Sequence, residues 1–600
     1  MGLLSNMMGS LNSIFGVALT LVSSLTQQQT NGKSLWGTLQ APTFPLFLSS
    51  NPLIGGFPWG LLTADGSNPY TQAPITGVTR NYDFTVQRGM IAPDGYQKSV
   101  ILINGQFPGP IIEANWGDTI VVTIHNQITG PEEGTSFHWH GLLQKATPYM
   151  DGVPSVQQCP IPPGSSFTYS FQADLYGSSW YHSHYSAQYA GGLLGPMIIH
   201  GPSNAKYDID LGPVFLTDYY HQEYFDILKT ATAPLQSGGN PAPLSDNNLI
   251  NGKGNFDCST VDPGDTTKCT NNAGVAKFQF TTGKTHRLRL INAGAEALQR
   301  FSIDGHTMTV IANDFVPVKP YKTTVVTLGI GQRTDVLVTA NQGSSTSSFW
   351  MRSNISTICS LAKQPNALAA IYYDRADTSK TPTSTAWNVP DPGTCANDDL
   401  SITEPYYTIT PNAPTTTTTM EINFFINSTG NFLWTLDGTS FRANYNNPLL
   451  LLANVGKLDF PDIWNVKNFG SNSTVRVIIN NNSPAAHPMH LHGHNMQVLH
   501  EGPGQWDGTI TRASNPQRRD VQQIRVGGHM VFQYDTDNPG VWPFHCHIAW
   551  HVSSGLYANM MERPLDIKNV LTIPTILSQT CTQWALYTAN KVVNQIDSGL

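Results

Sequence analysis

The sequence contains little charge and no long hydrophobic run. Only 12% of its 600 residues are charged, and the formal net charge is −8. This balance argues against the basic surface of a nucleic-acid-binding protein, and the composition also argues against coiled coils and disordered tails. No segment after residue 30 reaches the roughly 18 uninterrupted apolar residues that a membrane-spanning helix needs. Neither a nucleic-acid partner nor a membrane anchor is expected.

The sequence is instead rich in turn-forming residues. It contains 52 Gly and 41 Pro, and Thr, Ser and Asn are abundant. These residues indicate many turns and few long helices. Runs typical of strands recur between them, as at residues 119–124 and 476–479, whereas a longer helix is expected only at 575–594. We therefore expect an all-β, multidomain, extracellular enzyme.

Two similar phrases, at residues 115–124 and 473–481, each precede a His-rich segment. This repetition suggests related β units. The apolar stretch at 14–22 has the length of a signal-peptide core, although no basic residue precedes it, and a secreted protein is expected. The expected organisation is a signal peptide at 1–27, an N-terminal extension or propeptide at 28–75, β units at 76–203, 204–375 and 400–600, and a linker at 376–399.

Seven cysteines are consistent with secretion. An odd count leaves three pairs and one thiol with a separate role, for which Cys546 is the candidate. Nearness in sequence suggests the pairs Cys258–Cys269 and Cys359–Cys395, which leaves Cys159–Cys581, but the connectivity does not follow from sequence alone. Glycosylation sequons lie at Asn354, Asn427, Asn472 and Asn481.

The histidines are clustered far beyond chance. Eighteen His in 600 residues predict roughly half of one His-x-His triplet. Five occur: His138/His140, His182/His184, His490/His492, His492/His494 and His545/His547. In a strand, residues two apart face the same way, so each triplet offers two imidazoles to one side. A lone histidine is usually an ordinary core or surface residue, but clusters confined to the first and last thirds indicate metal binding.

The segment 542–551 carries the most specific signal. Cys546 lies between two histidines, and strand alternation points its sulfur away from their side. One thiolate with two imidazoles in a trigonal arrangement is a site that selects copper for electron transfer. His487 and His551 are the candidate imidazoles. Leu556 lies where a weak axial ligand would be expected, and the missing donor should raise the reduction potential.

A structural zinc site in a secreted β-sandwich is the simpler alternative. Zinc would favour more thiolates or fewer histidines. It would also leave the doubled His pairs unexplained.

Four segments now resemble the signature segments of multicopper oxidases, in the same order: 138–141, 180–184, 487–494 and 545–551. The surrounding sequence, over roughly residues 76–600, resembles ascomycete-type fungal laccases. The last four residues, 597–600, resemble the C-terminal plug of those laccases. The resemblance implies three consecutive cupredoxin-like Greek-key β-barrel or sandwich domains.

The resemblance also implies four copper ions and their ligands. The ligands would be His487, Cys546 and His551 for type 1 copper, with Leu556 in the non-coordinating axial place; His138 and His490 for type 2 copper; and His140, His182, His184, His492, His545 and His547 for the two type 3 coppers. Phenols or aromatic amines would give up single electrons at the type 1 copper, and dioxygen would become two waters at the other three. Cys546 would provide the short electron path. A monomer is expected.

Two carboxylates are candidate catalytic groups by the same resemblance. Asp246 matches the position of an acid in the phenol pocket, where it would accept the phenolic proton. Asp151 resembles an acid near the type 2 copper that relays protons to reduced oxygen. A loop-capping Asp and an Asp-Gly turn are the respective alternatives.

Other functions share part of this pattern. A ferroxidase, an ascorbate oxidase or a bilirubin oxidase would carry the same copper motifs. A copper-storage or electron-transfer protein would lack the oxygen chemistry, and the eight histidines of the trinuclear site argue against it.

Overall fold

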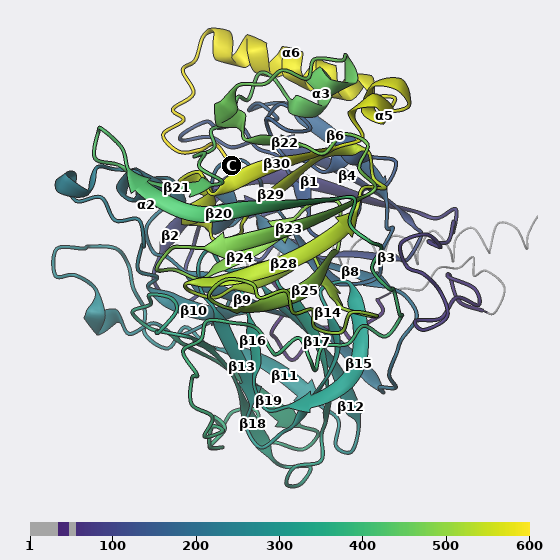
Figure 1. Ribbon diagram of the computed structural model, residues 1–600. Coiled ribbons are helices and arrows are strands. Elements are labelled where there is room, and N and C mark those ends of the chain that lie inside the picture. Colours follow the sequence, from purple (N-terminus) through teal and green to yellow (C-terminus); the bar gives the residue numbers. More distant parts are fainter. Residues whose placement is uncertain (1–33, 47–55) are drawn as a thin grey trace, which may run out of the picture.

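The computed structural model describes residues 34–46 and 56–600. Strands arranged in six sheets dominate, as the all-β expectation required, and two sheets form each of three successive β units (Figure 1). The expected signal peptide at 1–27 lies outside the described residues. Within them, no helix combines the length and the apolarity that crossing a membrane requires.

The first β unit contains β1 to β8. One sheet has the order β2-β1-β4-β6, made of β1 (Thr79–Ile91), β2 (Lys98–Ile103), β4 (Thr119–Asn126) and β6 (Ser166–Gln172). The other has the order β3-β8-β7-β5, made of β3 (Ile112–Asn115), β5 (His138–Trp139), β7 (Gly177–His182) and β8 (Leu194–His200). Burial alternates strictly along β4, where Ile120, Val122 and Ile124 face the core. This period of two is the strand pattern read from the sequence.

The middle β unit contains β9 to β19. Its larger sheet, β10-β9-β12-β17-β14-β15, consists of β9 (Ile209–Tyr219), β10 (Asn247–Ile250), β12 (Thr285–Asn292), β14 (Met308–Asn313), β15 (Val316–Thr323) and β17 (Arg333–Thr339). The smaller, β11-β19-β18-β13-β16, consists of β11 (Ala276–Phe280), β13 (Gln299–Ile303), β16 (Val326–Leu328), β18 (Ser348–Ile355) and β19 (Asn366–Tyr373). This unit has its own apolar core.

The third β unit contains β20 to β30. Its first sheet, β21-β20-β23-β28-β25-β26, consists of β20 (Thr416–Ile426), β21 (Phe432–Leu436), β23 (Thr474–Asn481), β25 (Met496–Pro503), β26 (Gln517–Arg519) and β28 (Gly528–Asp535). Its second, β22-β30-β29-β24-β27, consists of β22 (Val466–Asn468), β24 (His487–Leu491), β27 (Val521–Ile524), β29 (Gly540–Cys546) and β30 (Tyr557–Glu562).

The helices of the described chain are short. They are α2 (Tyr224–Ala231), α3 (Leu449–Asn454), α4 (Ala549–Ser553), α5 (Pro564–Asn569) and α6 (Thr575–Ala589). α3, α5 and α6 lie together at one end of the molecule, and the middle β unit forms the opposite end (Figure 1). The helix expected at 575–594 is thus present as α6, five residues shorter at its C-terminal end.

The three units share one strand pattern. The opening strand of each pairs in parallel with a later strand: β1 with β4, β9 with β12, and β20 with β23. The two repeated phrases of the sequence run into β4 and β23, which occupy equivalent places. The largest apolar cluster of the described residues joins the first and third units, so a site between them is enclosed by a continuous core.

All three expected disulfides are present: Cys159–Cys581, Cys258–Cys269 and Cys359–Cys395, with Cys546 the free cysteine of the described chain. The described part of the N-terminal extension packs closely on the body. Phe44 stacks on Trp36 and donates its backbone N–H to Asp210 of the middle unit. The backbone N–H of Leu46 donates to Glu113 of the first unit.

Candidate metal centre

Three buried donors form the first group, which we call the cysteine group: His487 in β24, Cys546 at the end of β29, and His551 in α4. Sγ of Cys546 lies 3.5 Å from Nδ1 of His487 and 3.6 Å from Nδ1 of His551, and the two nitrogens are 3.1 Å apart. The centre of such a triangle is about 2 Å from each donor, the length of a bond from a transition metal to nitrogen or sulfur.

The protonation of the cysteine group also suits a metal. Burial lowers the pKa of His487 and lowers that of His551 to about 3, so both rings are neutral as ligation requires. Burial raises the pKa of the Cys546 thiol, so a thiolate at this position needs a cation beside it. The backbone carbonyl of Leu556 accepts a hydrogen bond from the N–H of Cys546, and its own N–H donates to the carbonyl of His551. The buried side chain of Leu556 carries no donor atom.

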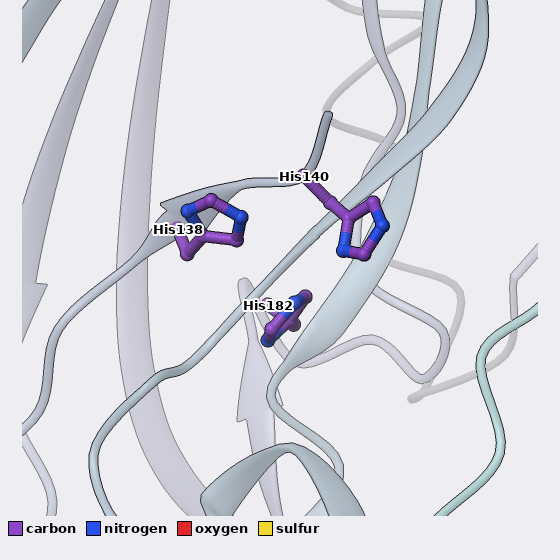
Figure 2. Close-up of side chains that lie close together, drawn as sticks. All are labelled: His138, His140 and His182. Carbon is purple, nitrogen blue, oxygen red and sulfur yellow. The ribbon is translucent and has the colours of Figure 1, made fainter. Parts of the chain in front are cut away.

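Eight buried histidines form the second group, the eight-histidine group: His138, His140, His182, His184, His490, His492, His545 and His547. Figure 2 shows three of these rings, from β5, the residue after it and β7, around a common space. Nε2 of His545 lies 3.1 Å from Nε2 of His492 and 3.4 Å from Nε2 of His184. Rings from the first and third β units therefore meet in this group.

Hydrogen bonds leave one nitrogen of several rings without a protein partner. Nδ1 of His138, His182 and His490 lies 2.9 Å from the backbone oxygens of Asp151, Ser183 and Asp520, respectively. A carbonyl only accepts, so each Nδ1 carries the proton and each Nε2 keeps a free lone pair. Those three Nε2 atoms are buried and unpaired. Buried polar atoms without partners are costly, and a bound cation would satisfy them.

One strand joins the two groups. Sγ of Cys546 reaches the cysteine group, whereas the rings of the flanking His545 and His547 belong to the eight-histidine group. Strand alternation at the end of β29 therefore has the effect expected from the sequence.

Two carboxylates hold rings of the eight-histidine group. Oδ2 of Asp151 lies 2.9 Å from Nδ1 of His492, and Oδ1 lies 3.1 Å from Nδ1 of His138. Oδ1 of Asp520 lies 3.0 Å from Nε2 of His140. Asp151 was expected from the sequence, but Asp520 was not. Its segment, Arg-Arg-Asp, has no metal-ligand spacing and reads as a polar surface turn.

Two further carboxyls lie near the cysteine group or the cavity beside it. Asp246 forms an ion pair with Lys363 at 2.8 Å and lines a cavity of about 440 Å³ together with Tyr220. Glu296 is 9% exposed and accepts a hydrogen bond from Tyr220 at 3.3 Å. Burial raises the pKa of Glu296 to about 8.

Tyr220 connects Glu296 to the cysteine group. Its hydroxyl accepts the indole N–H of Trp550, the residue before His551 in α4. Glu296 was not singled out from the sequence, because an isolated acid among small apolar residues carries no motif.

The C-terminal residues are buried beside the eight-histidine group. Asp597 accepts a hydrogen bond from Ser186 at 2.7 Å, two residues after His184. The carbonyl of Gly599 accepts from the hydroxyl of Tyr445 at 2.7 Å, and Leu600 is 1% exposed. The tail is therefore buried and hydrogen-bonded next to the segment that carries His184.

Comparisons with known proteins agree with this geometry. Three family profiles, each described as multicopper oxidase, match residues 85–204, 210–376 and 415–566. Oxidoreductase OpS5 of Beauveria bassiana is 41% identical over 551 residues, which cover 90% of this chain and 91% of that protein. Laccase-2 of Botryotinia fuckeliana is 37% identical over 553 residues, covering 90% and 92%.

A solved structure gives the same result. The crystal structure of laccase from Botrytis aclada superposes with a TM-score of 0.81 at 36% identity, covering 90% of this chain and 98% of that chain. The chain therefore belongs to the multicopper oxidase family and is a copper-binding oxidoreductase of the laccase type.

Proposed function

We propose that this enzyme removes single electrons from phenols or aromatic amines at the cysteine group and reduces dioxygen to two waters at the eight-histidine group. The observation that carries the proposal is the end of β29, where one cysteine and its two neighbouring histidines serve both groups. Bound copper would supply the one-electron acceptor at the first group and the four-electron reduction of dioxygen at the second.

We assign one copper to the cysteine group and three to the eight-histidine group. His487, Cys546 and His551 would hold type 1 copper, and the neighbouring Leu556 offers no donor atom. His138 and His490 would hold type 2 copper, and the type 3 pair would be held by His140, His182, His184, His492, His545 and His547. The neutral rings and the unpaired Nε2 atoms support this set. Four bound coppers would supply the four one-electron acceptors that reduction of dioxygen to water requires.

The electron enters through His551. Its exposure is 6%, whereas His487 and Cys546 are fully buried at 0%. The ring of Trp434 packs 4.5 Å from that of His551, and Phe432 packs against Trp434 in turn. An aromatic surface at the one accessible ligand suits an aromatic substrate.

A carboxyl near this edge accepts the phenolic proton. Asp246 was expected from the sequence in this role, and Glu296 is the second candidate. Glu296 is favoured, because its partner Tyr220 accepts a hydrogen bond from Trp550 beside His551, whereas Asp246 forms an ion pair with Lys363. Asp246 lines the adjoining cavity, where it would contact the polar end of a substrate.

On the oxygen side, Asp151 orients His138 and His492 and relays protons to reduced oxygen. The C-terminal residues 597–600 close the approach to this group.

We further propose that the enzyme is a secreted monomer, since three disulfides favour an oxidising compartment. Glycosylation is proposed at Asn354, Asn427 and Asn472, which are partly exposed. Asn481 is left out of this proposal, because the residue is 2% exposed and its amide donates to the carbonyls of Ala485 and Arg525.

Turnover on a bulky phenol and on ferrous iron, each followed by oxygen uptake, tests the substrate class. A laccase favours the phenol, and a ferroxidase favours the iron. A copper-storage or electron-transfer protein consumes no oxygen with either, and a zinc protein is colourless. Faster turnover of ferrous iron than of the phenol would overturn the proposal.

A further inference from the structure

None of the histidines in the two groups comes from the middle β unit, yet a loop of that unit touches the eight-histidine group. Gly331 has a φ of +83°, and a Cβ there would lie 3.0 Å from Cδ2 of His547 and 3.1 Å from Cε1 of His140. Only a glycine lets the backbone approach two rings this closely. The middle unit therefore forms part of the wall around the group.

Arg333, two residues further on at the start of β17, is fully buried. Its Nη1 and Nη2 donate to Oδ1 and Oδ2 of Asp520 at 2.5 and 2.7 Å, a bidentate pair. Its Nε donates to the carbonyl of Ser178, and Nη1 also donates to that of Gly331. One guanidinium thus binds the first, middle and third β units together.

Asp520, which Arg333 fixes in place, contacts two rings of the eight-histidine group. Its Oδ1 faces Nε2 of His140 at 3.0 Å, and its backbone oxygen accepts from Nδ1 of His490 at 2.9 Å. Arginine has donors only, so both carboxylate oxygens of Asp520 act as acceptors. Nε2 of His140 consequently carries a proton, and its Nδ1, which lies 3.3 Å from Nε2 of His547, is left with a free lone pair.

The pair also packs against the chain that carries His140. Gly141 has a φ of +80°, and a Cβ there would lie 2.5 Å from both Nη2 of Arg333 and Oδ2 of Asp520. The ring of Phe315 covers the guanidinium at 5.2 Å. The pair therefore fills the space beside Gly141, and a side chain at that position would collide with it.

We propose that Arg333 is a positioning residue for the oxygen-reducing group: by clamping Asp520 it sets the orientation of His140 and His490, and with it the tautomer of His140. The middle unit thus orients ligands of the eight-histidine group, although it contributes no ligand itself. The inference rests on the proposed function, in which these two histidines are copper ligands.

The test compares Arg333→Lys with Arg289→Lys in the copper-loaded enzyme. Lysine keeps the charge but loses the bidentate fork. Arg289 is the matched control, because it is 1% exposed, pairs with Asp210 at 2.5 Å and also binds Ser178, but contacts neither group. Copper per chain, the EPR spectrum of the non-blue copper, the blue absorption band and phenol kinetics are measured for both.

We expect Arg333→Lys to lose non-blue copper or change its EPR spectrum and to lower kcat by about 10–100-fold, the usual effect of altering a group that orients a metal ligand. The blue band and the KM for the phenol should stay unchanged, and Arg289→Lys should resemble the wild type. Gly331→Ala, which presses on His140 and His547 from the same loop, should reproduce the altered EPR spectrum.

Identical copper content and EPR spectra in Arg333→Lys and Arg289→Lys would overturn the inference. If the wild-type enzyme binds no non-blue copper, that result would contradict the proposed function itself. If Arg333→Lys does not fold, Gly331→Ala decides between the outcomes by the same spectra.

Discussion

Oδ2 of Asp151 lies 2.9 Å from Nδ1 of His492, although 341 residues separate the two in sequence. The first β unit supplies the carboxylate and the third supplies the ring, so the contact forms only when both units have folded and docked. The same carboxylate also reaches His138 at 3.1 Å. Asp151 is therefore placed to orient two rings at once, which is the position that the proposed relay of protons requires.

Asp151→Asn should lower kcat for oxygen reduction by about 10–100-fold, because an amide no longer relays protons and holds the two rings less firmly. The KM for the phenol and the blue band should not change, since the cysteine group is untouched. Oxygen uptake at saturating phenol measures the effect. An unchanged kcat would contradict the role given to Asp151.

Glu296→Gln should lower kcat/KM for a phenol by about tenfold or more, since the proton acceptor is lost. Oxidation of ferrocyanide, which releases no proton, should be unaffected and serves as the control. In the wild type, kcat/KM for the phenol should rise towards pH 8, where Glu296 ionises, and in the variant this rise should disappear. Asp246→Asn is the comparison, and a larger loss there would transfer the role to Asp246.

Glu296 should also make stability depend on pH. Its pKa is about 8 in the folded protein against an ordinary value of 4.5, so the folded state holds a proton that the unfolded state releases. The contribution of Glu296 to the free energy of unfolding therefore falls as the pH rises from about 4.5 to 8. The Tm of Glu296→Gln relative to the wild type should increase across that window and then level off. A constant difference between pH 5 and pH 8 would exclude this assignment.

Deletion of residues 597–600 should lower both Tm and kcat. It removes the buried side chain of Leu600 and the hydrogen bonds that Ser186 and Tyr445 make to the tail. Water would then reach the eight-histidine group more freely. Thermal unfolding and oxygen uptake measure the two effects, and unchanged values of both would show that the tail is not a plug.

The sequence predicts the part of the site that has local spacing. His-x-His triplets and the cysteine between two histidines follow from strand periodicity, and the structure brings these side chains together. The disulfide Cys159–Cys581, which spans 422 residues, was suggested only as the pair left over by the two nearer ones, and the structure confirms it.

Residues whose role depends on docking between units could not be predicted in this way. Arg333 and Asp520 are 187 residues apart, and neither belongs to a motif with metal-ligand spacing. The proposed role of Glu296 depends on its hydrogen bond with Tyr220, which lies in a different segment of the chain. The N-terminal extension was expected to be a propeptide or an irregular segment, because its sequence has no period; its contacts with Asp210 and Glu113 arise only in the folded chain.

The most direct test of the account is a visible spectrum of the copper-quantified enzyme, recorded while oxygen uptake is followed after addition of a simple phenol. The account predicts about four coppers per chain, a blue thiolate-to-copper band, and oxygen consumption without release of peroxide. A protein that remains colourless after reconstitution with copper would remove Cys546 as a copper ligand and contradict the whole electron path.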